Sequence, residues 1–283
     1  MDNDLTKSLV CDLCGGEHSA PFAQKFDLQY VECKDCGFVY SDVRSFDFSA
    51  HNAATMQSLQ ETQLGKHGST RYQKEYQKRL REFEPYRKTN RFLEVGCSAG
   101  AFLRVVHDAG WEEYGVEPET QWANYCLDEL GLNVHVGTLE TADYQENSFD
   151  VVYSNAVIEH LVNPSVVIEE AFRILRPGGL LYADTVNLAS YTWKFLGSQW
   201  KLFDPRMHLS LYTPETLRRH CEAAGFRVRK IATHGVRFHA TRADQPRGWR
   251  RVVDELRKTP YSIAARRNLK GDNICVYAEK PVD

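Results

Sequence analysis

A strand, a glycine loop and a helix start meet in one segment of the sequence, Phe92-Leu93-Glu94-Val95-Gly96-Cys97-Ser98-Ala99-Gly100. The four residues before Gly96 predict a short buried strand, and a helical pattern begins at Ala101. The loop between them has no bulky side chain, so a ligand is able to approach its backbone closely. The helix N-terminus behind the loop favours a negatively charged group such as a carboxylate. This segment therefore predicts an α/β domain with a ligand site after its first strand.

Strands and helices alternate from this segment to the end of the chain. Helix signals include Gly110 after the first helix, Asn163-Pro164 before a later one, and a third pattern from Thr213-Pro214 to Gly225. The repeated units predict a Rossmann-like α/β fold, a doubly wound and mostly parallel seven-stranded sheet with helices on both faces. The predicted strands cover 92–95, 114–117, 133–136, 149–154, 180–183, and segments near 228–231 and 274–278.

Two acidic side chains stand where such a sheet binds ligands, at the carboxyl ends of its strands. Glu94 lies in a buried strand, where its charge is costly without a cation, and the ammonium group of a methionine moiety would satisfy it. Glu117 ends the second strand, where a carboxylate is able to accept both hydroxyls of a ribose. The spacing Gly96-x-Ser98-x-x-Ala101 also overlaps the dinucleotide fingerprint, so these residues alone leave NAD as an alternative.

Four segments in fixed order resemble a known family. Residues 92–103 resemble motif I of class I S-adenosylmethionine-dependent methyltransferases, with Ser98 in place of the middle glycine. The other segments are Gly137-Thr138-Leu139-Glu140, Phe149-Asp150-Val151-Val152-Tyr153-Ser154-Asn155-Ala156-Val157-Ile158-Glu159-His160-Leu161 and Leu175-Arg176-Pro177-Gly178-Gly179. The resemblance covers residues 90–185 and implies a methyltransferase with S-adenosyl-L-methionine as methyl donor.

The resemblance also implies a set of cofactor-binding residues. It places the adenine beside 139–140 and the methionyl side beside 155–157. The whole set is Glu94, Gly96, Cys97, Ser98, Ala99, Gly100, Phe102, Glu117, Pro118, Leu139, Glu140, Asn155, Ala156 and Val157.

Cysteine spacing near the N-terminus predicts a zinc ribbon. Two Cys-x2-Cys pairs, Cys11 with Cys14 and Cys33 with Cys36, supply four thiolates for a tetrahedral Zn²⁺, and a glycine follows each pair. Short strands are expected within 26–31 and 38–40. Because protein fills all four ligand positions, the predicted ion is structural; two disulfides are the alternative. The remaining cysteines are expected to be buried apolar side chains: Cys97, Cys126, Cys221 and Cys275.

The chain divides into three parts. Residues 1–45 form the predicted ribbon, 46–90 a linker with a covering helix, and 91–283 the cofactor-binding domain. That domain carries an expected acceptor-site insertion at 187–212 and a basic insertion at 237–271. In the middle part, a stripe at helical spacing predicts a helix that covers one edge of the cofactor cleft. The stripe consists of Tyr72, Tyr76, Leu80 and Phe83.

Composition is that of an ordinary globular protein, with 42% hydrophobic and 26% charged residues. The net charge of −3 gives no overall bias toward nucleic acid or an acidic membrane. No signal peptide and no apolar run of about 20 residues is recognised in the sequence, so a soluble cytoplasmic protein is expected.

Two histidines are candidates for the general base that a hydroxyl acceptor requires. His208, in the segment after the fifth strand, is the first choice, with Tyr212 or Asp204 as helpers; a structural role in capping the next turn is the alternative. His160 is the second candidate, or a group that orients the cofactor. Glu159-His160 resembles the Glu-His of ubiquinone O-methyltransferases, which use a metal, but Ala156 replaces the earlier glutamate of that pattern. No catalytic metal is therefore expected.

The sequence indicates the methyl acceptor less directly than it indicates the methyl donor. A zinc ribbon before this type of domain resembles bacterial methyltransferases of sugar and surface-polysaccharide pathways, which implies O- or C-methylation of a sugar, sugar nucleotide or glycan hydroxyl. The alternatives are an rRNA or tRNA methyltransferase, an O-methyltransferase of a small aromatic or quinone-like acceptor, and a non-catalytic cofactor-binding subunit.

The basic insertion predicts an anionic partner, such as a nucleotide diphosphate, a lipid-linked glycan phosphate or RNA. A solvated helical insertion is the alternative. Its cations are Arg242, Arg247, Arg250, Arg251, Arg257, Lys258, Arg266 and Arg267.

Overall fold

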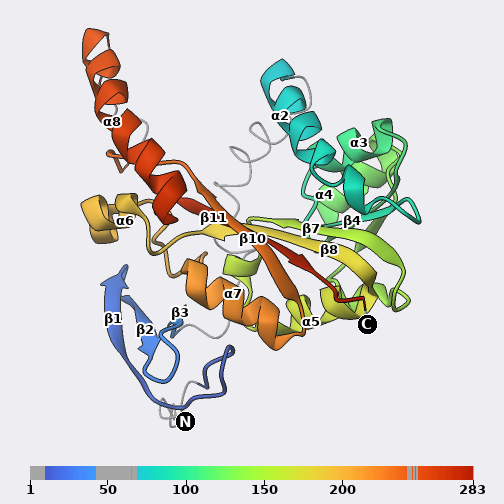
Figure 1. Cartoon of the computed structure of the whole chain (residues 1–283), viewed down its shortest axis with the longest axis horizontal. Coiled ribbons are helices and arrows are strands. Elements are labelled where there is room, and N and C mark those ends of the chain that lie inside the picture. Colours follow the sequence, from blue (N-terminus) through green and yellow to red (C-terminus); the bar gives the residue numbers. More distant parts are fainter. Residues whose placement is uncertain are drawn as a thin grey trace.

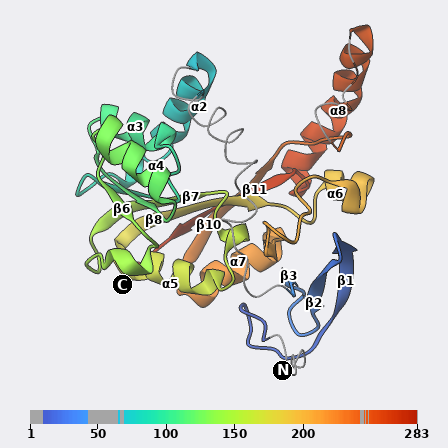
Figure 2. The same ribbon diagram turned by 180° about the vertical axis from the view of Figure 1, so that it is seen from behind.

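The computed structural model describes residues 10–42, 65, 69–240, 244, 246 and 248–282. Its largest feature is a seven-stranded sheet in the order β10-β11-β8-β7-β4-β5-β6 (Figures 1 and 2). Six of the strands run in the same direction, while β11 runs antiparallel to both of its neighbours. The predicted doubly wound, mostly parallel seven-stranded sheet is confirmed. The strands are β4 (Arg91–Val95), β5 (Glu112–Glu117), β6 (Val134–Val136), β7 (Phe149–Asn155), β8 (Leu175–Val186), β10 (Arg227–His234) and β11 (Asn273–Glu279).

Helices cover both faces of this sheet, as the strand–helix pattern predicts. Helices α2 and α3 pack on one face, and α5 and α7 pack on the other (Figure 1). The helices are α2 (Thr70–Arg81), α3 (Ala101–Asp108), α4 (Thr120–Asn124), α5 (Pro164–Ile174), α6 (Tyr191–Leu196), α7 (Pro214–Ala223) and α8 (Trp249–Asn268). Shorter turns are η1 (Glu84–Tyr86), η2 (Tyr125–Glu129), η3 (Glu140–Ala142), η4 (Ile158–His160) and η5 (Gly197–Gln199).

The predicted covering helix is α2, and its apolar stripe packs inward. Leu80 and Phe83 are buried, and the Tyr76 ring meets Phe102 of α3 edge-on at 5.4 Å. Phe83 also contacts Phe92 of β4 at 5.9 Å, so an aromatic layer joins this helix to the sheet. Burial of such a ring stabilises the fold by about 1.5–3 kcal/mol. The expected linker before α2 lies largely outside the described residues.

The N-terminal part forms a second sheet with strand order β1-β2-β3-β9. Its first three strands are β1 (Ser19–Lys25), β2 (Leu28–Cys33) and β3 (Val39–Ser41), and β9 (Ser210–Leu211) comes from the insertion after β8. One expectation was wrong: Phe26 lies in the turn between β1 and β2, with φ 55°, rather than in a strand. Because β9 belongs to the insertion after β8, the ribbon shares a sheet with the large domain.

The insertion after β8 is more regular than its sequence pattern indicates. It contains α6, η5 and β9, and its side chains form a small core around Trp200 and Phe203. Tyr30 of β2 belongs to this core, and its ring lies 4.6 Å from that of Phe203. The ribbon thus packs against this segment, in a contact between residues far apart in sequence.

Strand β8 is longer than predicted. Instead of starting at Leu180, it begins at Leu175 and runs through Pro177-Gly178-Gly179. Gly178, with φ 71°, donates its N–H to the Lys280 carbonyl at 2.8 Å, so the segment after β11 pairs with this glycine turn. Among the described residues, no helix combines the length and hydropathy needed to cross a membrane.

Candidate functional site

The loop after β4 is shaped by two glycines. Gly96 and Gly100 both have φ 70°, in the left-handed region that favours glycine. A Cβ on Gly96 would lie 2.5 Å from Cγ2 of Val157, which follows β7. The loops after β4 and β7 are thus in van der Waals contact at the point where the strand order reverses, since β4 lies between β5 and β7. This is where sheets of this kind bind ligands.

Glu117 connects the ends of β4 and β5. Its carboxylate accepts hydrogen bonds from the backbone N–H of Ser98 at 2.8 Å and of Glu119 at 2.9 Å. Burial raises the pKa of Glu117, although both hydrogen bonds lower it. Each carboxylate oxygen has two lone pairs, so the group retains acceptor capacity for the hydroxyls of a ribose. The geometry fits the role predicted for this residue.

The remaining predicted cofactor residues fall into two groups. Several are buried side chains of the scaffold: Cys97 packs near Gly115, Phe102 packs on Tyr153, and Leu139 lies in the main core. These residues help to shape the site through their backbone or packing. The exposed group at the rim is Pro118, Glu140, Asn155 and Ala156, while Val157 is half-buried and Glu94 and Ala99 are buried.

Both candidate bases lie together after β7. The His160 and His208 ring centroids are 4.9 Å apart, although the residues belong to η4 and to the insertion after β8. His160 Nδ1 is 2.6 Å from the Met207 carbonyl, and His208 Nδ1 is 2.5 Å from the Leu202 carbonyl. A carbonyl only accepts, so both Nδ1 atoms carry the proton and the lone pair of each ring lies on Nε2.

A buried carboxylate completes this cluster. Glu159 is 1% exposed and accepts a hydrogen bond from Thr185 Oγ1 at 2.8 Å. Burial raises the pKa of Glu159, and His160 opposes that effect. Burial, followed by the neighbouring His160, lowers the pKa of His208 to about 4. Ligand atoms of Glu159, His160 and His208 lie within 4.8 Å of one another, so the cluster is also able to hold a metal ion.

Glu159 was not among the site residues predicted from the sequence. The sequence feature that could have identified it is its position directly before His160. The two predicted helpers of His208 are placed differently. The Asp204 carboxylate binds Arg206 at 2.7 Å, and Tyr212 is fully buried with its ring 5.3 Å from Phe38 of the ribbon. In the described part of the chain, the ring of His208 hydrogen-bonds to the Leu202 carbonyl rather than to either of these side chains.

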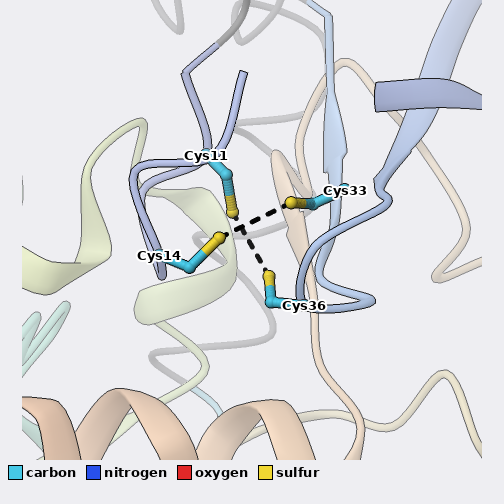
Figure 3. Close-up of side chains that lie close together, drawn as sticks. All are labelled: Cys11, Cys14, Cys33 and Cys36. Carbon is cyan, nitrogen blue, oxygen red and sulfur yellow. Dashed lines mark hydrogen bonds between the residues drawn. The ribbon is translucent and has the colours of Figure 1, made fainter. Parts of the chain in front are cut away.

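The four N-terminal cysteines converge, as their spacing predicts (Figure 3). Cys11 Sγ lies 3.5 Å from Cys36 Sγ, and Cys14 Sγ lies 3.6 Å from Cys33 Sγ. A disulfide would need about 2.0 Å. Four Zn–S bonds of about 2.3 Å at tetrahedral angles separate neighbouring sulfurs by about 3.8 Å. Gly15 and Gly37 provide the left-handed turns after each pair, with φ 70° and 75°. The donor set therefore fits zinc.

The ribbon contacts the segment that carries His208. Tyr30 donates its hydroxyl to the His208 carbonyl at 2.5 Å, and Ser41 donates its N–H to the Leu209 carbonyl at 2.7 Å. On the other side of the ribbon, Asp12 accepts from Ser165 of α5 at 2.7 Å and faces His220 at 3.4 Å. No sequence signal marked Tyr30 for this contact, because it joins residues 178 positions apart.

Comparison with known proteins places this geometry in a family. The model of the family described as "Methyltransferase domain" matches residues 67–231. Curated relatives include the ubiquinone biosynthesis O-methyltransferases of Maricaulis maris, 30% identical over 118 residues, and of Aromatoleum aromaticum, 27% identical over 153. These alignments cover 39% and 50% of this chain, and 46% and 65% of the relatives. The chain thus spans about half to two thirds of the relatives' length.

Solved structures show the same fold. A methyltransferase from Archaeoglobus fulgidus is 22% identical, with a TM-score of 0.55 and 79% of this chain and 99% of that one covered. Phosphoethanolamine N-methyltransferase 2 from Haemonchus contortus is 18% identical, with a TM-score of 0.54 over 74% and 53% of the two chains. The family model spans more than half of the sequence and includes the loops after β4, β5 and β7. The chain therefore belongs to the family described as "Methyltransferase domain".

Proposed function

We propose that this enzyme transfers a methyl group to a hydroxyl of a small aromatic, phenol-like acceptor. Two observations support the proposal. The curated relatives described above are named O-methyltransferases of ubiquinone biosynthesis. The cluster of His160, His208 and Glu159 provides the proton acceptor that a phenolic hydroxyl requires. The sugar acceptor expected from the ribbon finds no support in these relatives, and neither does a phosphate-bearing glycan.

The methyl donor belongs in the loop after β4. We assign its ribose to Glu117, its carboxylate side to the N-terminus of α3 behind Gly100, and its methionyl side to the residues after β7. Bound S-adenosylmethionine supplies an electrophilic sulfonium methyl. Gly96 lets the loop after β4 pack directly on Val157, since any side chain at this position would clash. The chain's contribution to this step is orientation of the acceptor behind the methyl group.

The histidine pair then accepts the hydroxyl proton. The lone pairs on Nε2 of both rings make each ring a proton acceptor, and the carboxyl group of Glu159 lies beside the pair. Burial, followed by the neighbouring His160, lowers the pKa of His208 to about 4, so the pair holds one proton more readily than two. As the proton leaves, the acceptor oxygen forms a bond to the methyl carbon and the carbon–sulfur bond breaks.

Separate substitutions test these roles. For His160→Ala and His208→Ala we expect kcat to fall by about 10²–10⁴-fold, with little change in the affinity for S-adenosylmethionine. His18→Ala, an exposed ribbon histidine with an 85% exposed side chain, is the matched control and should retain full activity. Methyl transfer would be measured on a catechol, a nucleotide sugar and bulk RNA with the same labelled donor. Turnover on the sugar or the RNA alone would overturn the acceptor assignment.

A metal-assisted reaction is the second candidate, because the same three side chains are able to ligate a cation. Both histidines donate Nδ1–H to backbone carbonyls, which is the usual orientation of metal-bound imidazoles. A cation there would lower the pKa of a bound hydroxyl and leave no role for a histidine base. The base mechanism predicts that added Mg²⁺, Mn²⁺ or Zn²⁺ leaves kcat unchanged, both in enzyme treated with a chelator and in untreated enzyme. Activity that requires the ion and is lost in Glu159→Gln together with ion binding would favour the metal.

We also propose that the cysteine cluster holds one structural Zn²⁺. The sulfur separations and the glycine turns support it. With four thiolates the ion has no open position, so it acts on the reaction only through the fold of the ribbon.

A further inference from the structure

The outward side of α8 is apolar. Four of its side chains recur at helical spacing on one face, and their exposed fractions are large: Trp249 72%, Val252 61%, Leu256 68% and Ile263 52%. A helix of a globular protein usually turns such a stripe toward the core. Here the helix extends away from the sheet, and its far end projects into solvent (Figures 1 and 2).

The opposite side of α8 attaches the helix to the rest of the enzyme. Ala265 is buried, and its carbonyl accepts a hydrogen bond from Thr233 of β10 at 2.9 Å. Asp254 pairs with His239 at 3.1 Å and with Lys258 at 2.6 Å. Tyr261 packs edge-on against Tyr191, Phe195 and Phe238 at 5.2–5.4 Å. Because these contacts hold the helix by its inner side, the apolar stripe remains outside.

Charge distinguishes among possible occupants of the stripe. The helix carries six cationic and only two acidic side chains, while the whole chain has a net charge of −3. Two copies of α8 packed stripe to stripe would bring these positive charges together, which is unfavourable. An anionic polymer such as RNA would pair with the cations but leave the apolar side chains unused. An anionic lipid bilayer matches both features. The cations are Arg250, Arg251, Arg257, Lys258, Arg266 and Arg267.

We propose that α8 docks the enzyme on the surface of a bilayer that contains anionic lipids. The four apolar side chains enter the boundary between headgroups and acyl chains, and the flanking arginines lie at the level of the lipid phosphates. Docking of this kind is independent of the acceptor proposed above. It leaves the sheet and the loops after β4 and β7 outside the bilayer, since α8 is attached at the β10 and β11 end of the sheet.

Vesicle co-sedimentation tests this proposal with the full chain. Wild type should sediment with vesicles of phosphatidylcholine and phosphatidylglycerol, and far less with phosphatidylcholine alone. The double variants Trp249→Ser/Leu256→Ser and Arg250→Gln/Arg257→Gln should each lower the partition coefficient about tenfold or more. Val282→Ser, equally exposed at 72%, and Arg71→Gln/Lys78→Gln on the exposed side of α2 are matched controls that should bind like wild type.

Unchanged affinity for S-adenosylmethionine would show that each variant is folded, since none of the substituted residues touches the donor site. The proposal is overturned if wild type ignores anionic vesicles, or if the apolar variants bind them as well as wild type does. Saturable RNA binding that depends on the arginines, without vesicle binding, would assign the helix to nucleic acid. A dimer in sedimentation velocity that Leu256→Ser dissociates, again without vesicle binding, would make the stripe an interface between copies.

Discussion

Two separate features of the structure require a glycine at position 96, the backbone conformation and the contact with Val157. Its backbone has φ 70°, and a Cβ would lie 2.5 Å from Val157. Gly131, with φ 63°, has the same backbone demand, but no atom lies within 4 Å of the place of its Cβ. The two glycines therefore separate backbone strain from the clash with the loop after β7.

Gly96→Ala is expected to weaken S-adenosylmethionine binding by about tenfold or more, because the clash displaces the loop in addition to the backbone strain of about 1–2 kcal/mol. Gly131→Ala should lower the free energy of unfolding by the strain alone and leave the affinity unchanged. Calorimetric titration of both variants measures the difference. Equal affinities would mean that the contact between the two loops has no part in donor binding.

Asp150 shows how a buried charge supports the same domain from the opposite end of β7. Its carboxylate accepts the backbone N–H groups of Lys88, Thr89 and Asn90, each at 2.8 Å, and pairs with Arg176 at 2.5 Å. Burial alone would raise the pKa of Asp150, but the hydrogen bonds from Arg176 and the amides outweigh it and hold the pKa below 3.8. The segment before β4 is anchored by this one side chain.

A depressed pKa in the folded state makes this contribution pH-dependent. The stabilisation is complete above the unfolded value of 3.8 and is lost as the pH falls toward the lower folded value. Asp150→Asn should cost on the order of 3 kcal/mol near neutral pH, because Arg176 loses its buried partner. Urea unfolding at several pH values should show the cost shrinking below about pH 4. Asp128→Asn, an exposed carboxylate, is the control; a cost that is constant down to low pH would contradict the assignment.

At the scale of elements, the pairing of β3 with β9 connects the proposed zinc site to the proposed catalytic cluster of His160, His208 and Glu159. Cys33 ends β2, and Tyr30 of the same strand donates to the His208 carbonyl. Loss of the metal would release β2 and β3, and with them the backbone that holds one histidine of the pair. The donor site, on the other strands, does not include these residues.

Cys33→Ser is therefore expected to lose zinc and to lower kcat/KM for the acceptor, while donor affinity is nearly retained. Tyr30→Phe should retain zinc and show a smaller loss, of about 1 kcal/mol in the activation free energy, from one hydrogen bond. Metal analysis and steady-state kinetics measure both effects. Cys275→Ser, a buried cysteine of β11, is the matched control and should retain its zinc. Normal acceptor kinetics in zinc-free enzyme would disprove the connection.

For the whole molecule, one core joins the ribbon to the main sheet. Phe38 and Tyr40 of the ribbon belong to the same buried cluster as Leu93 of β4 and Leu217 of α7. A cooperative unit of this kind unfolds in a single transition. We expect zinc chelation to lower the melting temperature of the entire protein. Thermal scans that follow aromatic absorbance and donor binding in parallel measure this, and a separate early transition confined to the ribbon would refute it.

Much of the fold could be predicted from local sequence patterns. The strand and loop around Gly96, the helix start at Thr213 and the seven strands were predictable because hydrophobic periodicity, glycine turns and caps act over a few residues. The convergence of the four N-terminal cysteines was predictable for the same reason, since each Cys-x2-Cys pair forms a local turn. The turn at Phe26 and the early start of β8 were missed, because pairing with other strands decided them.

The sequence by itself determined that the chain forms a methyltransferase domain, with a glycine loop after the first strand of that domain and four cysteines in two closely spaced pairs. Only the tertiary structure decided that His160 and His208 form a pair beside Glu159, that the ribbon holds the segment of His208, and that the apolar stripe of α8 faces outward. The physical reason is the distance in sequence between the residues that interact. Glycine turns and Cys-x2-Cys turns are specified by residues that are neighbours in the chain. The pair, the shared sheet and the orientation of α8 depend on packing between residues tens to more than a hundred positions apart, which no local pattern records.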